Sequence, residues 1–326
     1  MTKVAVVILN YNGQKFLEKF LPSVVDNNDG YEIIVADNAS TDNSIDFLRS
    51  NYPNLKTIQL SSNQGFAGGY NSALQEIKAE YYVLLNSDVE VSKNWVNPII
   101  DLMKNDASIA ACQPKIRSYH QKTHFEYAGA AGGYIDWLGY PFCRGRIFDS
   151  YEQDFGQYDD TKEVFWATGA CMFVRAEVFR QLGGFDAHFF AHMEEIDLCW
   201  RMKNAGHKIM YSSVSTVYHV GGGTLHKSNP RKTFLNYRNG LAMLYKNLPS
   251  NKLFSTILIR LILDGISGIK LLIDGSFADF LAVIKAHFAF YAMIPKLKRK
   301  SPKNVSEIYQ KSIVWEYFVK KQKPII

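Results

Sequence analysis

Cysteine is scarce in this chain, and its four copies in 326 residues form no C-x-x-C pair. Cys112, Cys143, Cys171 and Cys199 lie in apolar or aromatic surroundings, so neither a zinc cluster nor a disulfide framework is expected. We expect reduced, mostly buried thiols in a cytoplasmic protein.

Long hydrophobic runs are also missing. The N-terminal apolar run, 4–9, is too short for the core of a signal peptide. No stretch of about 18 uncharged apolar residues occurs, because charges interrupt the hydrophobic C-terminal region at Arg260, Asp264, Lys270, Asp279 and Lys285. A membrane-spanning helix is therefore not expected.

Two nucleotide-binding signatures are absent as well. Neither G-x-G-x-x-G nor G-x-x-x-x-G-K-[ST] occurs, and the glycine-rich run 65–69 matches neither pattern. Dinucleotide binding and P-loop phosphate binding therefore lose their usual sequence support.

The net charge of +6 is unevenly distributed. Residues 1–226 carry 19 Lys and Arg against 26 Asp and Glu, whereas residues 227–326 carry 18 against 5. An acidic body with a basic tail does not suit a protein that binds nucleic acid through its main face. We divide the chain here into a domain over 1–226 and a basic, helical region over 227–326.

Short β-branched runs alternate with helical patterns in the first part of the chain. Residues 4–9, 33–36, 57–60 and 82–85 are typical of strands, with helical spacing between them. Continuous apolar strands separated by helices predict an α/β, Rossmann-like fold with a mostly parallel central sheet and flanking helices. Ligands of such sheets bind along the edge formed by the carboxyl ends of the strands.

The alternation breaks over residues 112–162, where we expect hairpins and loops over the site. Regularity resumes with a predicted strand over 164–174, a helix near 194–204 and a strand near 209–218. Residues 231–326 look helical.

Polar clusters follow the predicted strands. The run 37–42 either binds a ligand or caps a helix, since Asp and Ser are favoured at N-caps. Asp88 follows the fourth strand, where an exposed carboxylate can hold a hard divalent cation. His219 ends a strand and precedes three glycines, so it either lies beside a ligand or is structural.

Three carboxylates lie at the start of the predicted helix near 194–204: Glu194, Glu195 and Asp197. Acids are favoured there by the helix dipole alone. Asp197 also fits an i,i+4 pair with Arg201. Because adjacent side chains point to different faces, one of Glu194 and Glu195 can be structural while the other faces a cleft.

Seven motifs occur in a fixed order: VVILNYNG at 6–13, ADNASTD at 36–42, NQGFAGGYN at 63–71, LLNSDVEV at 84–91, ATGACMFVR at 167–175, GGFDAHFFAHMEEIDLCWR at 183–201 and YHVGGGT at 218–224. With them the chain resembles the inverting glycosyltransferases of family 2, which have the GT-A fold, and among these the bacterial rhamnosyltransferase-like members. The resemblance covers about residues 3–245. It implies transfer of a sugar from a nucleotide-diphospho-sugar, dTDP-rhamnose-like or UDP-hexose, to a hydroxyl of a cell-surface glycan or lipid-linked acceptor.

The resemblance also implies roles for individual residues. The nucleotide and donor site would comprise Asn10, Asp37, Asn63, Gly65, Asn71, Asn86 and Asp88. Gly169 and Ala170 would line the cleft for sugar and acceptor, and Asp88 and His219 would bind Mg²⁺ or Mn²⁺. Asn86 stands where the metal motif of the family has its first Asp. Glu194-Glu195 stands where the family usually has Glu-Asp, which places Glu195 at the position of the catalytic base and Glu194 beside the acceptor or its loop.

Two other functions stay open. A sugar-1-phosphate nucleotidyltransferase would show a Gly-rich, basic loop after the first strand, where this chain has only Lys15 near Asn10–Gly13. A non-catalytic, sugar-nucleotide-binding subunit of a polysaccharide assembly complex would show the same nucleotide-binding motifs.

The C-terminal third contains an amphipathic pattern. On a helical projection one stripe is polar, comprising Thr256, Arg260, Asp264, Ser267, Lys270 and Asp274, and the rest is apolar. The basic residues over 296–300 follow a second apolar segment. We expect peripheral contact with the inner face of the cell membrane. A helical appendage packed on the core, or a homodimer interface, would show the same pattern.

Overall fold

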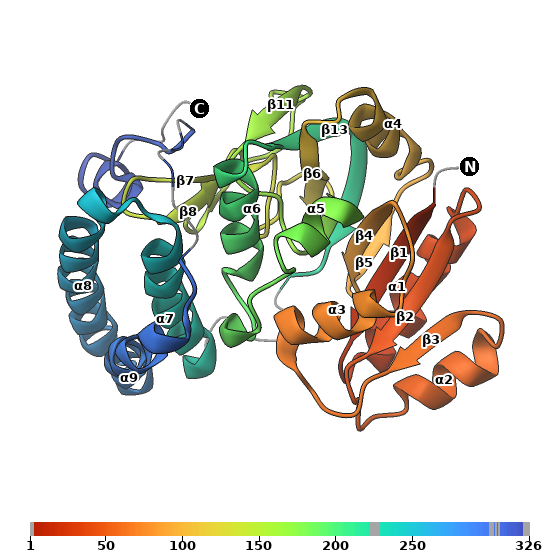
Figure 1. Cartoon of the computed structure of the whole chain (residues 1–326), viewed down its shortest axis with the longest axis horizontal. Coiled ribbons are helices and arrows are strands. Elements are labelled where there is room, and N and C mark those ends of the chain that lie inside the picture. Colours follow the sequence, from red (N-terminus) through yellow and green to blue (C-terminus); the bar gives the residue numbers. More distant parts are fainter. Residues whose placement is uncertain (1–2, 222–228, 300–302, 304, 306, 322–326) are drawn as a thin grey trace.

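The computed structural model describes residues 3–221, 229–299, 303, 305 and 307–321 (Figure 1). The strands of its main sheet are β1 Val4–Asn10, β2 Glu32–Asp37, β3 Lys56–Gln59, β4 Tyr81–Asn86, β5 Val89–Val91, β6 Ile109–Ser118, β11 Thr161–Val164, β12 Cys171–Arg175 and β13 Lys208–His219. Within the described residues, their order is β11-β13-β6-β12-β4-β1-β2-β3, with β5 paired to β13. The strands β3, β2, β1 and β4 are parallel, so their carboxyl ends share one edge.

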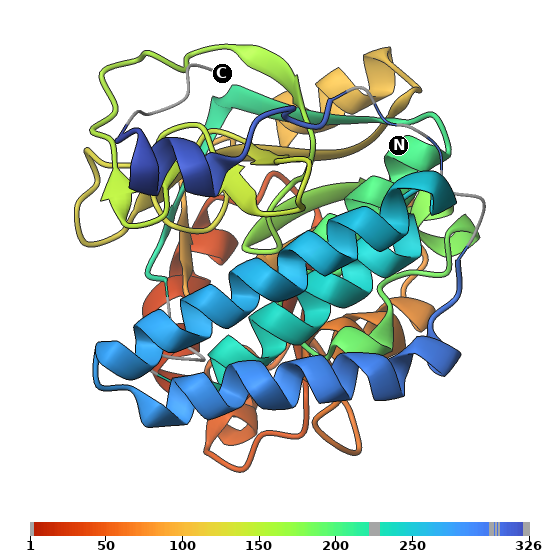
Figure 2. The ribbon, with the colours of Figure 1, turned by 90° about the vertical axis from the view of Figure 1, so that its left-hand side faces the viewer.

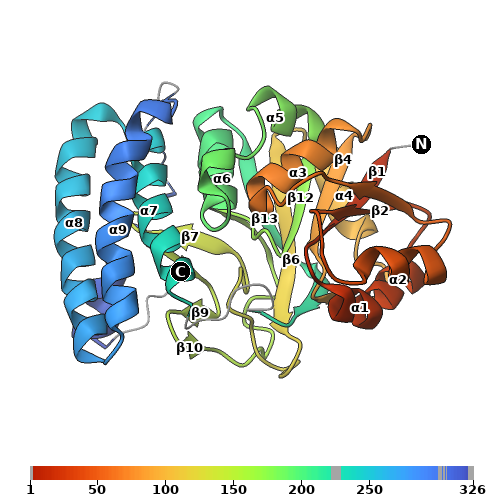
Figure 3. The same cartoon turned by 90° about the horizontal axis from the view of Figure 1, so that it is seen from below.

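Helices cover both faces of this sheet, as predicted. They are α1 Gln14–Asp26, α2 Ser44–Asn51, α3 Gly65–Gln75, α4 Asn97–Asn105, α5 Ala176–Gln181 and α6 Glu194–Asn204. Alternate residues of β1 enter two separate cores, Ala5 and Val7 packing with α3 and Val4 and Val6 with α1. Figure 3 shows α3, α5 and α6 on one side of the sheet and α1 and α2 on the other. The α/β fold predicted from the sequence is confirmed.

Two strand predictions were wrong. The stretch 164–174 is not one strand, because β11 pairs with β13 whereas β12 lies between β4 and β6. The chain must cross two strands between them, and residues 165–170 leave the ladder to do so. The region from residue 112 is not all loop either, since β6 runs to Ser118. Its buried Gln113 and Lys115 hide the strand pattern.

Short hairpins follow β6, as expected. Their strands are β7 Gly133–Ile135, β8 Pro141–Cys143, β9 Arg146–Ile147 and β10 Ser150–Tyr151. Within the described residues they form a second sheet in the order β10-β9-β8-β7. The loop before β7 carries Glu126, which reaches His219 at the edge of the main sheet.

Three long helices make up most of the C-terminal region: α7 Pro230–Asn247, α8 Ser250–Ile273 and α9 Phe277–Met293. Figure 2 shows α8 and α9 at the front of the molecule with α7 behind them. The sequence predicted that residues 231–326 are helical, but the described residues after α9 are helical only in part. The chain turns back to the small sheet, where Tyr309 pairs with Asp136 and the buried Ile313 donates its N–H to the Asp136 carboxylate at 3.0 Å. The proposed domain boundary at residue 226 lies outside the described residues.

The polar stripe of α8 does not face solvent. Thr256, Arg260 and Asp264 are buried, whereas Lys270 and Asp274 near the end of the helix are exposed. The stripe packs inward because the interior beside it is also polar, and Tyr140 donates a hydrogen bond to Asp264 at 3.2 Å. A projection of one helix cannot reveal such a partner.

All four cysteines are buried and free, as predicted. Among the described residues one segment, Phe277–Lys296, is long and apolar enough to span a membrane, with a mean hydropathy of 1.5 and 33% of its most apolar part buried. The sequence criterion missed it because Asp279 and Lys285 interrupt the run. Packed helices of proteins without a membrane span meet the same length and composition, so this finding is weak evidence.

Candidate active site

The first part of the site lies where β1 and β2 end. Asn10 and Asp37 are buried, and the Asn10 Nδ2 atom donates to Asp37 Oδ1 at 3.0 Å and to Ser40 Oγ at 3.1 Å. The other oxygen of Asp37 accepts the N–H of Ser40 at 2.9 Å. Among the described residues, Asn10 Oδ1 has no hydrogen-bond partner. The structure therefore brings together the two strand-end residues that the sequence assigns to the nucleotide pocket.

The run 37–42 includes a residue with the capping role that the sequence allowed. Asp42 accepts hydrogen bonds from the N–H of Gln14 at 3.0 Å and of Ser44 at 3.1 Å. It therefore stabilises the starts of α1 and α2, which is a capping role. Asp37 instead faces Asn10.

Asn38, which the sequence analysis did not select, joins the next part of the site. Its Nδ2 atom donates to Asn63 Oδ1 at 3.1 Å and to the Gly65 carbonyl at 2.9 Å. Gly65 has φ +71°, and a Cβ there would lie 2.4 Å from the Phe190 carbonyl oxygen. Only glycine fits this approach. Asn38 directly follows Asp37 at the end of a predicted strand. This position is the sequence signal that could have identified it.

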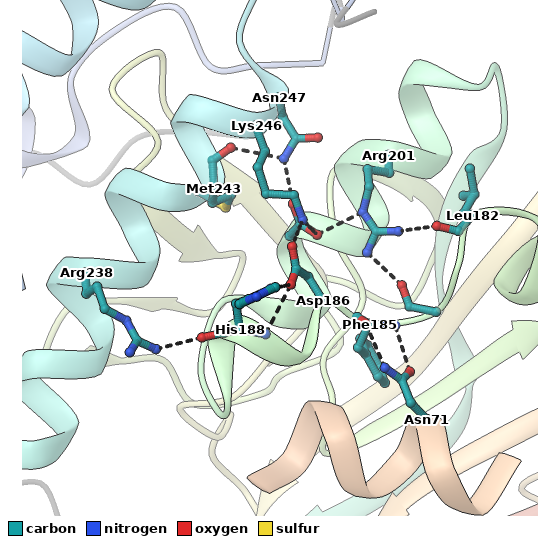
Figure 4. A network of polar contacts seen from close by, with 12 residues as sticks. Asn71, Leu182, Phe185, Asp186, His188, Arg201, Arg238, Met243, Lys246 and Asn247 are labelled. Carbon is teal, nitrogen blue, oxygen red and sulfur yellow. Dashed lines mark hydrogen bonds and ion pairs between the residues drawn. The ribbon is translucent and has the colours of Figure 1, made fainter. Parts of the chain in front are cut away.

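Asn71 lies apart from Asn10 and Asp37. Its side chain donates to the Phe185 carbonyl at 2.7 Å and accepts the Phe185 N–H at 3.0 Å (Figure 4). It also lines an open pocket of about 740 Å³ with Lys3, at the start of β1. Both ends of its amide thus hold a backbone turn.

Asp88 and His219 face each other at the same edge of the main sheet. His219 Nε2 lies 3.2 Å from Asp88 Oδ1, and His219 Nδ1 lies 2.9 Å from Glu126 Oε2. All three side chains are buried. Burial alone would lower the pKa of His219, but the two carboxylates raise it well above its usual value. Within the described residues, no group of three or more His, Cys, Asp and Glu side chains forms a ready metal cage.

Glu126 was not selected from the sequence. It lies in an irregular segment 93 residues before His219, and no local motif marks it. Gly221 follows His219 closely, and a Cβ there would lie 2.3 Å from Glu126 Oε1. Gly222 and Gly223 of the glycine motif lie outside the described residues.

The predicted acceptor residues meet the end of β4 and the start of α6. The Asn86 N–H donates to the Ala170 carbonyl at 3.0 Å. The Gly169 backbone lies near the Glu195 carboxylate and offsets part of the rise in its pKa that burial causes. A Cβ on Gly169 would lie 2.8 Å from the Phe66 ring. Gly169 therefore lets the backbone come close to both Phe66 and Glu195.

Glu194 and Glu195 differ in exposure. Glu194 is 3% exposed, whereas Glu195 is half-buried. Burial raises the pKa of both carboxyls, and the neighbouring charge of Glu195 adds to the increase for Glu194. Their Oε2 atoms have no hydrogen-bond partner in the part of the chain that the structure describes. Both of these oxygens are buried, and Glu195 is the more exposed of the two residues.

The backbone before α6 is strained. Phe190, His192 and Met193 have φ values of 66°, 70° and 72°, in the left-handed region. Each such residue costs about 1–3 kcal/mol, so surrounding contacts must hold the loop in place. The buried Asn239 of α7 does this, because its Nδ2 atom lies 2.8 Å from the His192 carbonyl and 2.9 Å from that of Ala191.

A buried ionic network holds α6 itself. Asp197 pairs with Arg201 at 2.8 Å, which confirms the predicted i,i+4 pair, and also with Lys246 at 2.9 Å. Lys246 also contacts Asp186 at 2.6 Å, and Asn247 donates to Asp197 at 2.8 Å (Figure 4). Asp197 is therefore structural. Sequence reasoning missed Lys246 because its partners lie 49 and 60 residues away.

We expect Asn239→Leu to lower kcat by about tenfold, because a misplaced catalytic loop weakens the chemical step. The variant keeps the branched shape of the side chain but removes the donor that holds the loop. Donor affinity should stay within about twofold, since Asn10 and Asp37 are untouched. Steady-state kinetics would measure the loss of kcat, and a donor-binding titration would measure the donor affinity. An equal loss of donor affinity would contradict a positioning role.

The α/β sheet with polar side chains along its strand ends is the arrangement of a ligand-binding α/β enzyme, and comparison with known proteins gives its family. The model of the family described as "Glycosyl transferase family 2" matches residues 5–183. The chain belongs to this family, and it is a glycosyltransferase. Glu195 and His219 lie beyond the matched range, so their roles depend on the geometry.

Curated relatives and solved structures also match this chain. The N-acetylglucosaminyl-diphospho-decaprenol L-rhamnosyltransferase of Mycobacterium tuberculosis is 26% identical over 66% of this chain and 75% of that protein. S. aureus TarS 1-349 in complex with UDP-GlcNAc has a TM-score of 0.56 at 16% identity, over 87% of this chain and 81% of that one. The mannosyltransferase PcManGT from Pyrobaculum calidifontis, in complex with GDP-Man and Mn2+, has a TM-score of 0.53 at 14% identity, over 89% and 87%. These structural likenesses support the fold.

Proposed function

We propose that the protein transfers one sugar, with inversion, from a nucleotide-diphospho-sugar to a hydroxyl of a lipid-linked or cell-surface glycan acceptor. One observation carries the proposal: a half-buried carboxylate, Glu195, lies against Gly169, next to the strand end that bears Asp88. The name of the mycobacterial relative supports a lipid-linked acceptor and rhamnose as the transferred sugar. A UDP-hexose remains the other donor to test.

In a single displacement, the chain's own residues supply the base. Glu195 accepts the proton of the acceptor hydroxyl as that oxygen forms a bond to the anomeric carbon. The bond from this carbon to the diphosphate oxygen breaks on the opposite face, which inverts the configuration. The nucleoside diphosphate leaves with the bonding electrons. Burial raises the pKa of Glu195, which makes its carboxylate a stronger base.

The pair Asp88 and His219 fits a divalent metal ion, such as the Mn2+ bound by PcManGT. Asp88 Oδ1 and His219 Nε2 are 3.2 Å apart, so one hard divalent cation could contact both. Bound there, Mg²⁺ or Mn²⁺ would neutralise the charge that develops on the leaving diphosphate. Asp88 and His219 would hold it, and diphosphate oxygens would complete its ligands.

Glu126 would orient His219 for that role. A carboxylate on the second ring nitrogen fixes the tautomer of a metal-binding histidine, and its loss typically costs 10–100-fold in metal affinity. We expect Glu126→Gln to weaken Mn²⁺ binding by about this factor, measured by calorimetry with saturating nucleoside diphosphate. Glu163→Gln is the matched control, because Glu163 lies on β11 and forms an ion pair with Lys203 at 2.7 Å. Equal affinities for the two variants would contradict this role.

We place the enzyme on the cytoplasmic side, peripheral to the membrane. An acceptor such as that of the mycobacterial relative carries a long lipid and stays in the bilayer. The basic C-terminal region, 227–326, with 18 Lys and Arg against 5 Asp and Glu, suits an anionic surface.

A donor screen tests the proposal directly. Thermal-shift measurements with UDP-, dTDP- and GDP-sugars, each with and without Mn²⁺, should single out one nucleotide, because a ligand of the native state raises stability by mass action. The selected donor is then incubated with lipid-linked acceptors, and the product anomer is determined by NMR. Retention of configuration, or no transfer with any donor that binds, would contradict the proposal.

A further inference from the structure

The side of α8 that faces solvent is its apolar side. Its exposed side chains repeat every three or four residues and include Phe254, Leu258, Ile262, Ile266, Ile269 and Ile273. Their exposed fractions run from 47% for Leu258 to 81% for Phe254. A continuous exposed apolar surface of this kind marks a site of contact with protein or lipid.

Buried polar contacts fix α8 in this orientation. Arg260, 4% exposed, donates to the Leu138 carbonyl at 2.8 Å and lies 3.4 Å from the carboxylate of the fully buried Asp264. Tyr140 donates to the same carboxylate at 3.2 Å. Turning the helix to hide its apolar side would break these contacts and leave the Leu138 carbonyl and the Tyr140 hydroxyl without these partners. The apolar side therefore stays outward.

The apolar surface continues onto α9. Phe277, Ile284, Phe288 and Tyr291 are 60%, 38%, 71% and 49% exposed. Figure 2 shows the two helices side by side along one side of the molecule. We call the exposed apolar side chains of α8 and α9 the outer face.

Charge decides which partner suits the outer face. The exposed charged residues in and after these helices are mostly lysines: Lys252, Lys270, Lys285, Lys296 and Lys298. In a twofold dimer the same patch meets itself, so these lysines would oppose one another. Anionic lipid headgroups complement them, and apolar side chains between them can enter the acyl boundary. We propose that the outer face lies on an anionic lipid bilayer, parallel to its surface.

This orientation deepens the proposed function, on which it rests. The Arg231 guanidinium lies 4.9 Å from the Phe190 ring, and Thr233 donates to Asp279 at 2.6 Å. The first turns of α7 therefore connect the strained loop before Glu194 with the start of α9. With the outer face on the bilayer, an acceptor whose lipid stays in the membrane can approach Glu195 along this end of α7.

Vesicle flotation tests the outer face without relying on catalysis. The full chain is mixed with vesicles of phosphatidylcholine, with or without phosphatidylglycerol, and centrifuged through a density gradient. We expect the protein to float with the anionic vesicles. The double variant Ile262→Gln, Ile266→Gln should bind at least about tenfold more weakly, since it removes two inserted apolar groups. The control is Phe155→Gln, Val214→Gln, which changes apolar residues that are 79% and 64% exposed outside α8 and α9.

The outcomes separate this inference from the proposed function. Both double variants should still transfer sugar to a water-soluble acceptor, which reports on the catalytic site alone. If the wild-type chain stays at the bottom of the gradient with both vesicle types, the inference is wrong whatever the transfer assay shows. If light scattering finds a dimer that Ile262→Gln, Ile266→Gln converts to a monomer, the outer face joins two copies and the inference is equally wrong.

Discussion

Glu195→Gln should lower kcat by about 10²–10⁴-fold and leave donor affinity within about twofold, because a general base contributes about that factor to rate. The amide keeps the size of the side chain and can still lie near the Gly169 backbone, but it cannot take a proton. The measurement is single-turnover transfer with saturating donor, beside a donor-binding titration.

Two variants at the same place sharpen this test. Glu195→Asp should retain part of the activity, since a carboxylate one methylene shorter can still act as base. Glu194→Gln should affect turnover less, because Glu194 is 3% exposed and Glu195 is half-buried. A different result would make Glu194 the base. In that case Glu195→Gln would turn over within about threefold of the wild type, well short of the usual loss, and Glu194→Gln would be inactive.

The pH dependence of kcat gives a second test of Glu195 as the base. A general base works only when ionised, so kcat should fall as the pH drops below the pKa of Glu195. Burial raises this pKa above the ordinary value of 4.5, so the acidic limb should lie above pH 4.5. The residual activity of Glu195→Gln should not show this fall of kcat at acidic pH.

The edge of the sheet could be predicted because it depends on local sequence. A run of apolar residues ending in Asn10, and another ending in Asp37, gives both the strand and the point where it ends. Parallel pairing then forces these ends together, and the structure finds the two side chains 3.0 Å apart. The helix Glu194–Asn204 and its Asp197–Arg201 pair are also local and were predicted correctly.

What the sequence could not show depends on contacts between distant segments. Glu126 meets His219 across 93 residues, and Asn239 holds the His192 carbonyl across 47. The orientation of α8 also depends on a contact between distant segments. The sequence shows its polar stripe, but it cannot show that Arg260 of this stripe turns inward and donates to the Leu138 carbonyl, 122 residues away.

Asp88→Asn should lower kcat by about 10²–10³-fold and abolish stimulation by Mn²⁺, because a metal ion on the leaving group supplies several kcal/mol, about tenfold in rate per 1.4 kcal/mol. The asparagine can still accept a hydrogen bond from His219, so the buried contact survives while the charge that attracts the cation is lost.

Asp42→Asn is the matched control, since Asp42 lies at the same edge of the sheet but accepts the N–H groups of Gln14 and Ser44. It should cost at most about 1 kcal/mol of stability, because Asn caps helices about as well as Asp, and it should keep its response to Mn²⁺. Full wild-type activity in excess EDTA, or unchanged Mn²⁺-dependent donor binding by Asp88→Asn, would show that Asp88 does not hold the metal.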